Sequence, residues 1–146
     1  MLFKNAIPPV YAQELFDHPE KVLEFVAHIK WQDGYTCRKC GNINYCEGKS
    51  PFSRRCTRCK LEESATANTI FHNVKFPLNK AFYIAYNVCV LGKELSTYNY
   101  AEILGINQMT CWKFRKRIQQ CVMKKQDAHD VKDILLTDIK TLSSYS

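Results

Sequence analysis

Five cysteines lie within the 23-residue stretch CRKCGNINYCEGKSPFSRRCTRC, the part of the chain best equipped for chemistry. Four of them form two C-x-x-C pairs, Cys37 with Cys40 and Cys56 with Cys59, and fifteen residues separate the pairs. This spacing is typical of zinc sites in which two tight turns present four thiolates to one ion. Because four sulfur ligands leave no open coordination position, we expect a single structural Zn²⁺.

Two other uses of the cysteine pairs remain open. A redox couple of the thioredoxin type requires a C-x-x-C at the head of a helix in a βαβ unit, and neither pair has that setting. Structural disulfides require an oxidising compartment, whereas the opening residues MLFKNAIPPVYAQELF lack the apolar core and cleavage site of a signal peptide. We therefore expect reduced thiols in a cytoplasmic protein.

The other cysteines and one histidine are weaker ligand candidates. Cys46 lies between the two pairs without a matching partner, so it is predicted to be a packing or surface thiol. Cys89, Cys111 and Cys121 fall on or near apolar helical stripes, where cysteine behaves as a small hydrophobe. His72 is predicted to form a hydrogen bond beside the cysteine-rich segment rather than to bind the metal.

The formal net charge of +7 is unevenly distributed along the chain. Residues 77–125 contain 8 Lys and Arg against 2 Asp and Glu, whereas residues 1–76 contain 11 against 8. A concentrated basic excess is typical of a surface that meets a polyanion, and an ordinary solvated face is the alternative. No apolar run approaches the ~18 residues that span a membrane, so we expect no membrane partner.

Patterning predicts a small, metal-stabilised α+β protein. Asp17 is expected to cap an N-terminal helix that ends near residues 33–34, and turn formers then replace any helical period. So few apolar residues follow that the cysteine-rich part needs its metal to fold. The predicted segments are a helical brace at 1–34, a four-cysteine zinc ribbon of short antiparallel strands at 35–76, a three-helix helix-turn-helix bundle at 77–125 and an acidic, Ser-rich tail at 126–146 without an assigned role.

The bundle is predicted from its helix-boundary residues. Its first helix begins at Pro77 and ends near Gly92. A short helix follows at 97–104, with Ser96 as its cap and Gly105 at its end, and Asn107 then caps a longer helix at 108–124. A short helix, a glycine-containing turn and a longer basic helix together form the helix-turn-helix pattern.

The longer helix has an apolar stripe and a basic face. The stripe consists of Cys111, Phe114, Ile118, Cys121 and Val122. Trp112 flanks it and is expected to anchor the helix to the core. We expect Gln108, Met109, Thr110 and Lys113 to reach DNA base edges, and Lys116, Arg117 and Lys124 to contact phosphates. Arg54, Arg55 and Arg58, clustered beside the cysteines, are expected to add phosphate contacts. An ordinary basic amphipathic helix is the alternative.

Four motifs carry a resemblance to a known family. They are W-x-D-G-Y-x-C-x-x-C-G at 31–41, the second cysteine pair, S-A-T-A-N-T-I-F-H-N-V-K-F-P-L-N-K-A-F at 64–82 and L-S-T-Y-N-Y-A-E-I-L-G-I-N-Q-M-T-C-W-K-F at 95–114. From about Phe16 to Met123 the chain resembles the N-terminal half of bacterial insertion-sequence transposases. These begin with a zinc ribbon and a helix-turn-helix and end in an ISXO-type DDE catalytic domain. Asn68 stands where the family usually has Gly, and Ala81 where it usually has Trp.

The resemblance implies recognition of transposon ends or of a regulatory site in double-stranded DNA. The family's catalytic domain would begin near residue 130 and needs well over a hundred residues, so we expect no enzymatic activity and assign no catalytic residue. The expected setting is the bacterial cytoplasm, in association with the nucleoid. A homodimer or a separate catalytic chain would be a natural partner, and a protein-interaction module or accessory subunit is the alternative function.

Overall fold

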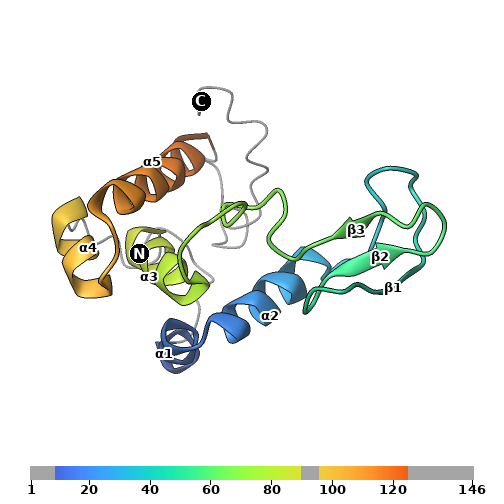
Figure 1. Cartoon of the computed structure of the whole chain (residues 1–146), viewed down its shortest axis with the longest axis horizontal. Helices are drawn as coiled ribbons and strands as arrows, with labels where there is room; N and C mark the ends of the chain where they lie inside the picture. Colours follow the sequence, from blue (N-terminus) through green and yellow to red (C-terminus); the bar gives the residue numbers. More distant parts are fainter. Residues whose placement is uncertain (1–8, 90–95, 125–146) are drawn as a thin grey trace.

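The computed structural model describes residues 9–89 and 96–124, which form five helices and one three-stranded antiparallel sheet (Figure 1). The predicted α+β class and the short antiparallel strands are confirmed. Helices gather at one end of an elongated molecule and the sheet lies at the other, with α2 running between them. The elements are α1 (Pro9–Asp17), α2 (Pro19–Lys30), β1 (Tyr45–Glu47), β2 (Arg54–Cys56), β3 (Glu62–Glu63), α3 (Leu78–Cys89), α4 (Thr97–Leu104) and α5 (Gln108–Lys124).

The helix that the sequence predicted from Asp17 to residues 33–34 corresponds to α2, and a further helix, α1, precedes it. Asp17 ends α1 instead of capping α2, so its prediction as an N-cap was wrong. The N-cap of α2 is His18, which takes an extended conformation (φ −136°, ψ 102°) because the ring of Pro19 disfavours a helical residue before it. The helix also ends earlier than predicted, at Lys30, with Trp31 as its C-cap.

The sheet has the strand order β1-β2-β3, and both pairs of strands are antiparallel. Cys46 pairs with Arg55 across β1 and β2, and Arg54 pairs with Glu63 across β2 and β3. Strands this short contribute few ladder hydrogen bonds, and a small sheet is marginal without further support. The cysteine-rich segment therefore needs contacts beyond the sheet itself.

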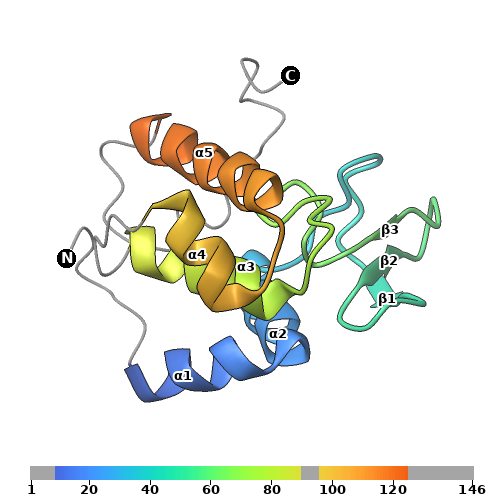
Figure 2. The same ribbon diagram turned by 60° about the vertical axis from the view of Figure 1, so that its left-hand side comes forward.

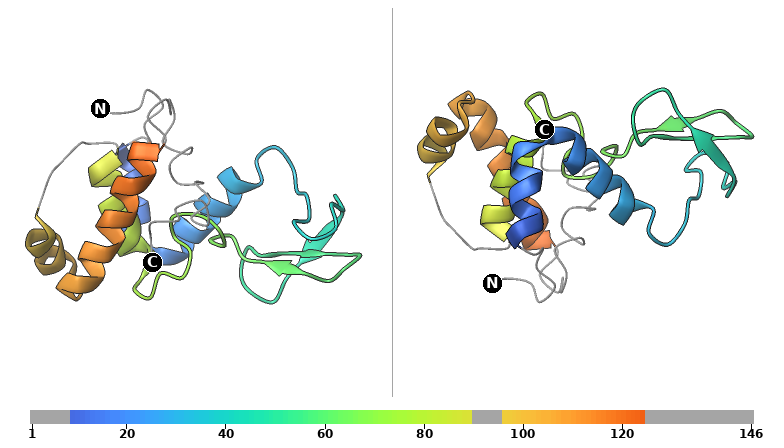
Figure 3. Two further views of the ribbon diagram at one scale, coloured as in Figure 1. Left: turned by 90° about the horizontal axis from the view of Figure 1, so that it is seen from above. Right: turned by 90° about the horizontal axis from the view of Figure 1, so that it is seen from below.

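Helix α3 is the centre of the helical end. It contacts α1, α2 and α5, and α4 packs against α5. Figures 2 and 3 show α1 and α5 on either side of α3. Ala81, Phe82, Ile84 and Ala85 of α3 are at most 1% exposed, so this helix presents an apolar face to the core. The predicted helix end at Gly92, the side chains of Cys89 and Val122, and the tail at 126–146 lie outside the described residues.

A turn-rich segment at 64–76 connects the sheet to the helical core. Ala65 belongs to a small cluster with Trp31 and Tyr35 beside the cysteines. Ile70 and Phe71, at most 1% exposed, belong instead to the main core, where Phe71 stacks on Phe114 of α5. This segment thus ties two apolar clusters together.

Candidate metal centre and basic helical face

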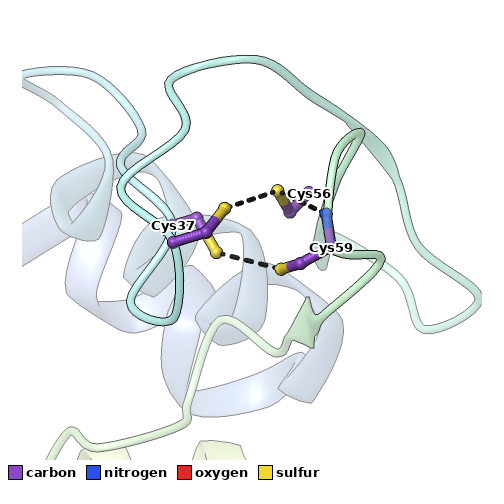
Figure 4. A group of neighbouring side chains, drawn as sticks. Cys37, Cys56 and Cys59 are labelled. Atoms are coloured by element: carbon purple, nitrogen blue, oxygen red, sulfur yellow. Dashed lines mark hydrogen bonds between the residues drawn. The ribbon is translucent and has the colours of Figure 1, made fainter.

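The four predicted sulfurs meet at one point beside the sheet. The ligand atoms of Cys37, Cys40, Cys56 and Cys59 all lie within 4.8 Å of one another, and Figure 4 shows the labelled side chains converging. The Sγ atoms of Cys37 and Cys59 are 3.5 Å apart, as are those of Cys40 and Cys56. Tetrahedral Zn²⁺ with bonds of about 2.3 Å would hold sulfurs about 3.8 Å apart. The tetrad therefore fits one metal ion.

Cys56 is held in a setting that favours its thiolate. Its sulfur accepts hydrogen bonds from the backbone N–H groups of Arg58 (3.3 Å) and Cys59 (3.4 Å) and from the Asn42 amide (3.4 Å). Burial by itself raises the pKa of Cys56, but these hydrogen bonds outweigh it and hold the pKa at about 5. Because the thiolate is the metal-binding form, the chain's own donors prepare this ligand.

In the first knuckle, the turn that carries Cys37 and Cys40, backbone donors likewise favour a thiolate. The backbone N–H of Cys40 and that of Lys39, which lies 3.4 Å from the sulfur, lower the pKa of Cys37. Cys59 differs: the backbone N–H of Leu61 lowers its pKa, but burial and the neighbouring sulfurs outweigh this and raise it to about 11. Cys37 and Cys56 therefore favour the thiolate, whereas burial of Cys59 and its hydrogen bonds to the neighbouring sulfurs favour its thiol form.

Two residues with positive φ shape the knuckles. Gly41 (φ 76°) directly follows the first pair and Lys60 (φ 67°) directly follows the second. Backbone N–H groups then close each turn, from Gly41 to the carbonyl of Cys37 and from Lys60 to that of Cys56. The two turns therefore have the same conformation, although only the first has a glycine at this position.

Cys46 and His72 lie where the sequence predicted. Cys46 is an exposed thiol on β1, and the Nδ1 atom of His72 accepts a hydrogen bond from the backbone N–H of Asn68 at 2.9 Å. Asn68 itself has φ 61°, a conformation that Asn tolerates better than most residues. Cys111 and Cys121 are buried, and burial raises the pKa of Cys111. No disulfide joins the cysteine side chains within the described part of the chain.

The three arginines near the cage have different surroundings. The Arg54 guanidinium lies over two aromatic rings, 4.7 Å from the centroid of Trp31 and 4.1 Å from that of Tyr45. Arg55 is half-buried on β2, and Arg58 is exposed on the knuckle. Arg54 thus braces the sheet against α2, and Arg58 is the most accessible of the three predicted phosphate contacts.

A buried ion cluster joins α2 to the sheet, and sequence reasoning missed it. Lys30 Nζ lies 2.6 Å from a Glu63 carboxylate oxygen, with 7% and 8% of the two side chains exposed. Arg38 Nε contacts the same oxygen at 2.9 Å, and Lys30 also donates to the carbonyls of Ser64 and Ala67. The sequence shows Glu63 close to the second cysteine pair, but this position does not identify Lys30, 33 residues earlier in the chain, as its partner.

Helices α4 and α5 begin and end as predicted. Ser96 Oγ accepts a hydrogen bond from the Asn99 N–H at 3.1 Å, which caps α4. Gly105 adopts φ 66° and ends that helix. The Asn107 side chain then accepts a hydrogen bond from the Met109 N–H at 2.8 Å, which caps α5. These local contacts fix the turn between the two helices.

The buried stripe of α5 is confirmed at Cys111, Phe114, Ile118 and Cys121. On the other side Gln108, Met109, Lys113 and Lys116 are exposed and Thr110 is half-buried. Trp112 is 46% exposed, so its predicted role as a core anchor was wrong. It lies one position beyond the buried stripe, and Lys116 Nζ lies 4.7 Å from its ring centroid.

Two of the predicted phosphate contacts differ from the rest. Arg117 Nη1 donates to the carbonyls of Ile70 and His72, both at 2.8 Å, so this arginine fastens the 64–76 segment to α5. The position of Lys124 at the end of α5 is defined, but its side chain lies outside the described residues. Among the side chains of α5 that the structure describes, Lys113 and Lys116 therefore form the exposed basic part of the face.

A groove of about 530 Å³ runs along α5. One wall is the segment from Asn73 to Phe76, and the other is α5 from Thr110 to Gln120. Lys75, Lys113 and Lys116 line it, so lysines from both walls share one hollow. Lys75 was not singled out by the sequence because it belongs to no helix.

No protein-family model, curated protein or solved structure matches this chain. Among the residues that the structure describes, the four cysteines are the one group of three or more side chains placed to hold a metal ion. No helix in the described ranges is long and apolar enough to cross a membrane. The chemistry of the site must therefore be argued from its own geometry.

Proposed function

We propose that the chain is a zinc-ribbon and helix-turn-helix protein that binds double-stranded DNA in a sequence-specific manner. The proposal rests on the charge and the exposed side chains of helix α5. Its sequence QMTCWKFRKRIQQCVMK has five basic residues and no acidic one, and it begins beside a tight turn with Lys113 and Lys116 exposed. Such a helix matches the electrostatics of a DNA groove.

In this proposal α5 is the reading helix and α4 supports it. Residues near the start of the helix (Gln108, Met109, Thr110 and Lys113) reach base edges, while Lys116 contacts a phosphate. Arg58 on the knuckle extends the footprint along the duplex. The zinc-bearing segment acts as a rigid second contact, because α2 and the 64–76 segment fix it to the helical end.

The proposed metal is Zn²⁺, held by Cys37, Cys40, Cys56 and Cys59. Four thiolates with closed tetrahedral geometry favour zinc over harder cations such as Mg²⁺ and Ca²⁺. When bound, the ion supplies folding free energy rather than reactivity, because no ligand position is left for a substrate. Elemental analysis of protein prepared without added metal is expected to give about one zinc per chain.

The likeness to insertion-sequence transposases suggests the biological target. We propose that the chain recognises transposon ends or a site derived from them, alone, as a homodimer or together with a separate catalytic chain. It is assigned no catalytic role of its own. Incubation with Mg²⁺ and candidate end DNA should yield no strand cleavage, and cutting that persists through purification would contradict this assignment.

Duplex binding by matched variants tests the DNA proposal. The double substitution Lys113→Ala with Lys116→Ala should weaken duplex affinity about tenfold or more, measured by fluorescence anisotropy. Lys21→Ala removes one exposed charge from α2 and should leave affinity unchanged. Selection of duplexes from a random pool should return a preferred motif. Equal affinity for all three proteins would contradict the proposed reading helix.

A protein-interaction role is the second candidate, and exposed apolar side chains at the sheet end favour it. Ile43 is 71% exposed, Tyr45 45% and Phe52 44%. If these side chains form a surface for a protein partner, the double substitution Ile43→Ser with Phe52→Ser should abolish binding of that protein and leave the affinity for duplex DNA unchanged. Duplex affinity that depends on α5 and not on these residues would favour the DNA proposal.

A further inference from the structure

The groove beside α5 is lined by aromatic as well as basic side chains, and binding of a regular duplex does not require the aromatic ones. Its two walls are the segment carrying Lys75 and Phe76 and the α5 face carrying Trp112, Lys113 and Lys116. Apolar and polar surfaces both line it. A duplex backbone offers sugars and phosphates, which need cations but no exposed aromatic ring.

The groove is strongly basic. Lys75, Lys113, Lys116 and Arg117 are among its lining residues, and none of the described residues that line it is acidic. Cations on both walls mean that an anion inside the groove is attracted from two sides. A phosphate-bearing strand is the ligand class that this charge arrangement fits.

An aromatic platform lies within this basic surface. Trp112 is 46% exposed, and Lys116 lies above part of its ring. Phe76 packs edge-on against the buried Phe114, with ring centroids 5.6 Å apart, so an aromatic ring of the opposite wall is held in place. An exposed indole beside cations is the combination on which unpaired bases stack.

The walls are also held at a fixed separation. Arg117 of α5 donates from one nitrogen to the carbonyls of Ile70 and His72, directly before the opposite wall begins. Asn73 (φ 55°) then turns the chain so that Lys75 and Phe76 line the groove. A preformed groove binds a strand without the cost of ordering its own walls.

We propose that this groove binds a short unpaired stretch of a nucleic-acid strand, with a base stacked on Trp112 and its phosphates between Lys75 and the α5 lysines. The inference deepens the proposed function, on which it rests, because α5 then serves both the duplex and an unpaired strand adjoining it. Trp112 and Lys75 are the residues specific to the groove, since neither belongs to the proposed duplex-reading set.

Tryptophan fluorescence tests the proposal directly. The chain has two tryptophans, and Trp31 is only 8% exposed, so a stacked base should quench the emission of Trp112 alone. Titration of the full chain with oligothymidylate is expected to give saturable, partial quenching. Trp112→Leu should abolish the quenching and weaken oligothymidylate binding about tenfold. Lys75→Ala should weaken binding severalfold, and the matched control Lys21→Ala should not.

Comparing duplexes separates this inference from the proposed function. A duplex with a single-stranded overhang should bind the wild type more tightly than a blunt duplex does, and Trp112→Leu should remove that difference. If blunt duplex binds well but Trp112→Leu changes neither affinity nor quenching, the groove proposal is overturned while the duplex proposal stands. If oligothymidylate quenches Trp112 and no duplex binds, the groove proposal is supported and the duplex proposal fails.

Discussion

At the scale of single residues, the cysteine cage depends on donors as much as on sulfurs. Backbone N–H groups and the Asn42 amide point at the sulfur of Cys56, and the N–H of Lys39 points at that of Cys37. Such hydrogen bonds orient the ligands and stabilise their charged form, as second contacts do in metal sites generally. The exposed Cys46 has no such surroundings, which makes it a natural control.

Substitution of a cage ligand should remove the metal. Cys56→Ser is expected to lower the metal content well below one ion per chain in the presence of a competing chelator, because the site loses one of its four thiolate ligands. Native mass spectrometry measures the stoichiometry. Cys46→Ser should retain the ion, and a loss of metal in that variant would contradict the assignment of four ligands.

A second residue-scale prediction concerns the buried pair of Lys30 and Glu63. Lys30→Met leaves a buried carboxylate without its closest cation and removes one hydrogen bond from each of the carbonyls of Ser64 and Ala67. It should lower the free energy of unfolding by about 3 kcal/mol, measured by denaturant titration. The exposed pair of Lys21 and Glu14, 3.5 Å apart, is the control, and Lys21→Met should cost less than about 1 kcal/mol. Equal costs would show that burial of the pair is unimportant.

At the scale of elements, the turn between α4 and α5 is set by local residues. Gly105 takes a left-handed conformation, and the Ile106 N–H returns to the carbonyl of Ala101. Asn107 then starts α5 at once. The direction of the basic helix relative to α4 therefore depends on three consecutive residues.

Substitution at this turn gives an element-scale prediction. A Cβ at Gly105 would meet nothing within 4 Å, so Gly105→Ala should cost only the strain of positive φ, about 1 kcal/mol of unfolding free energy. Gly105→Asn should cost less, because Asn tolerates this conformation. Thermal unfolding of the three proteins would show the order, and an Ala variant as stable as the wild type would contradict the argument.

The same elements indicate how far sequence reasoning reaches. The boundaries of α4 and α5 were predicted correctly because Ser96, Gly105 and Asn107 act on their immediate neighbours. The four-cysteine tetrad was predictable because two identical local turns suffice to define it. The pairing of Lys30 with Glu63 was not, because it depends on how α2 docks on the sheet.

Two further errors have the same origin. The outward position of Trp112 depends on where α5 packs against α3 and α4, and an apolar residue beside a buried stripe does not reveal it. The break between α1 and α2 depends on Pro19, which disfavours a helical conformation at His18. Long-range packing thus limited the prediction more than local chemistry did.

At the scale of the whole molecule, the two apolar clusters differ in the side chains that stabilise them. The main core includes large buried side chains from α1, α2, α3, α4, α5 and the 64–76 segment. The smaller cluster includes two cysteines of the tetrad, Cys37 and Cys56, among its six buried members. We therefore expect the sheet end to depend on a metal held by the tetrad, whereas the helical end has a core of its own.

Metal removal should accordingly act in two stages. A strong chelator is expected to abolish the dispersed amide signals of residues 35–63 in NMR spectra while most far-UV helical signal remains. Zinc should restore the lost signals. Loss of the helical signal at the same chelator concentration would contradict independent cores and indicate one cooperative unit.

The central claim is that α5 presents a basic reading face to duplex DNA, and its salt dependence tests that claim most directly. Anisotropy titrations of a labelled duplex between about 50 and 200 mM salt should give a log–log slope of about −2 or steeper, from the phosphate contacts of Lys116 and Arg58. Lys116→Ala should make the slope less steep by about one. Undetectable binding to any duplex at the lowest salt, or affinity independent of salt, would contradict the account.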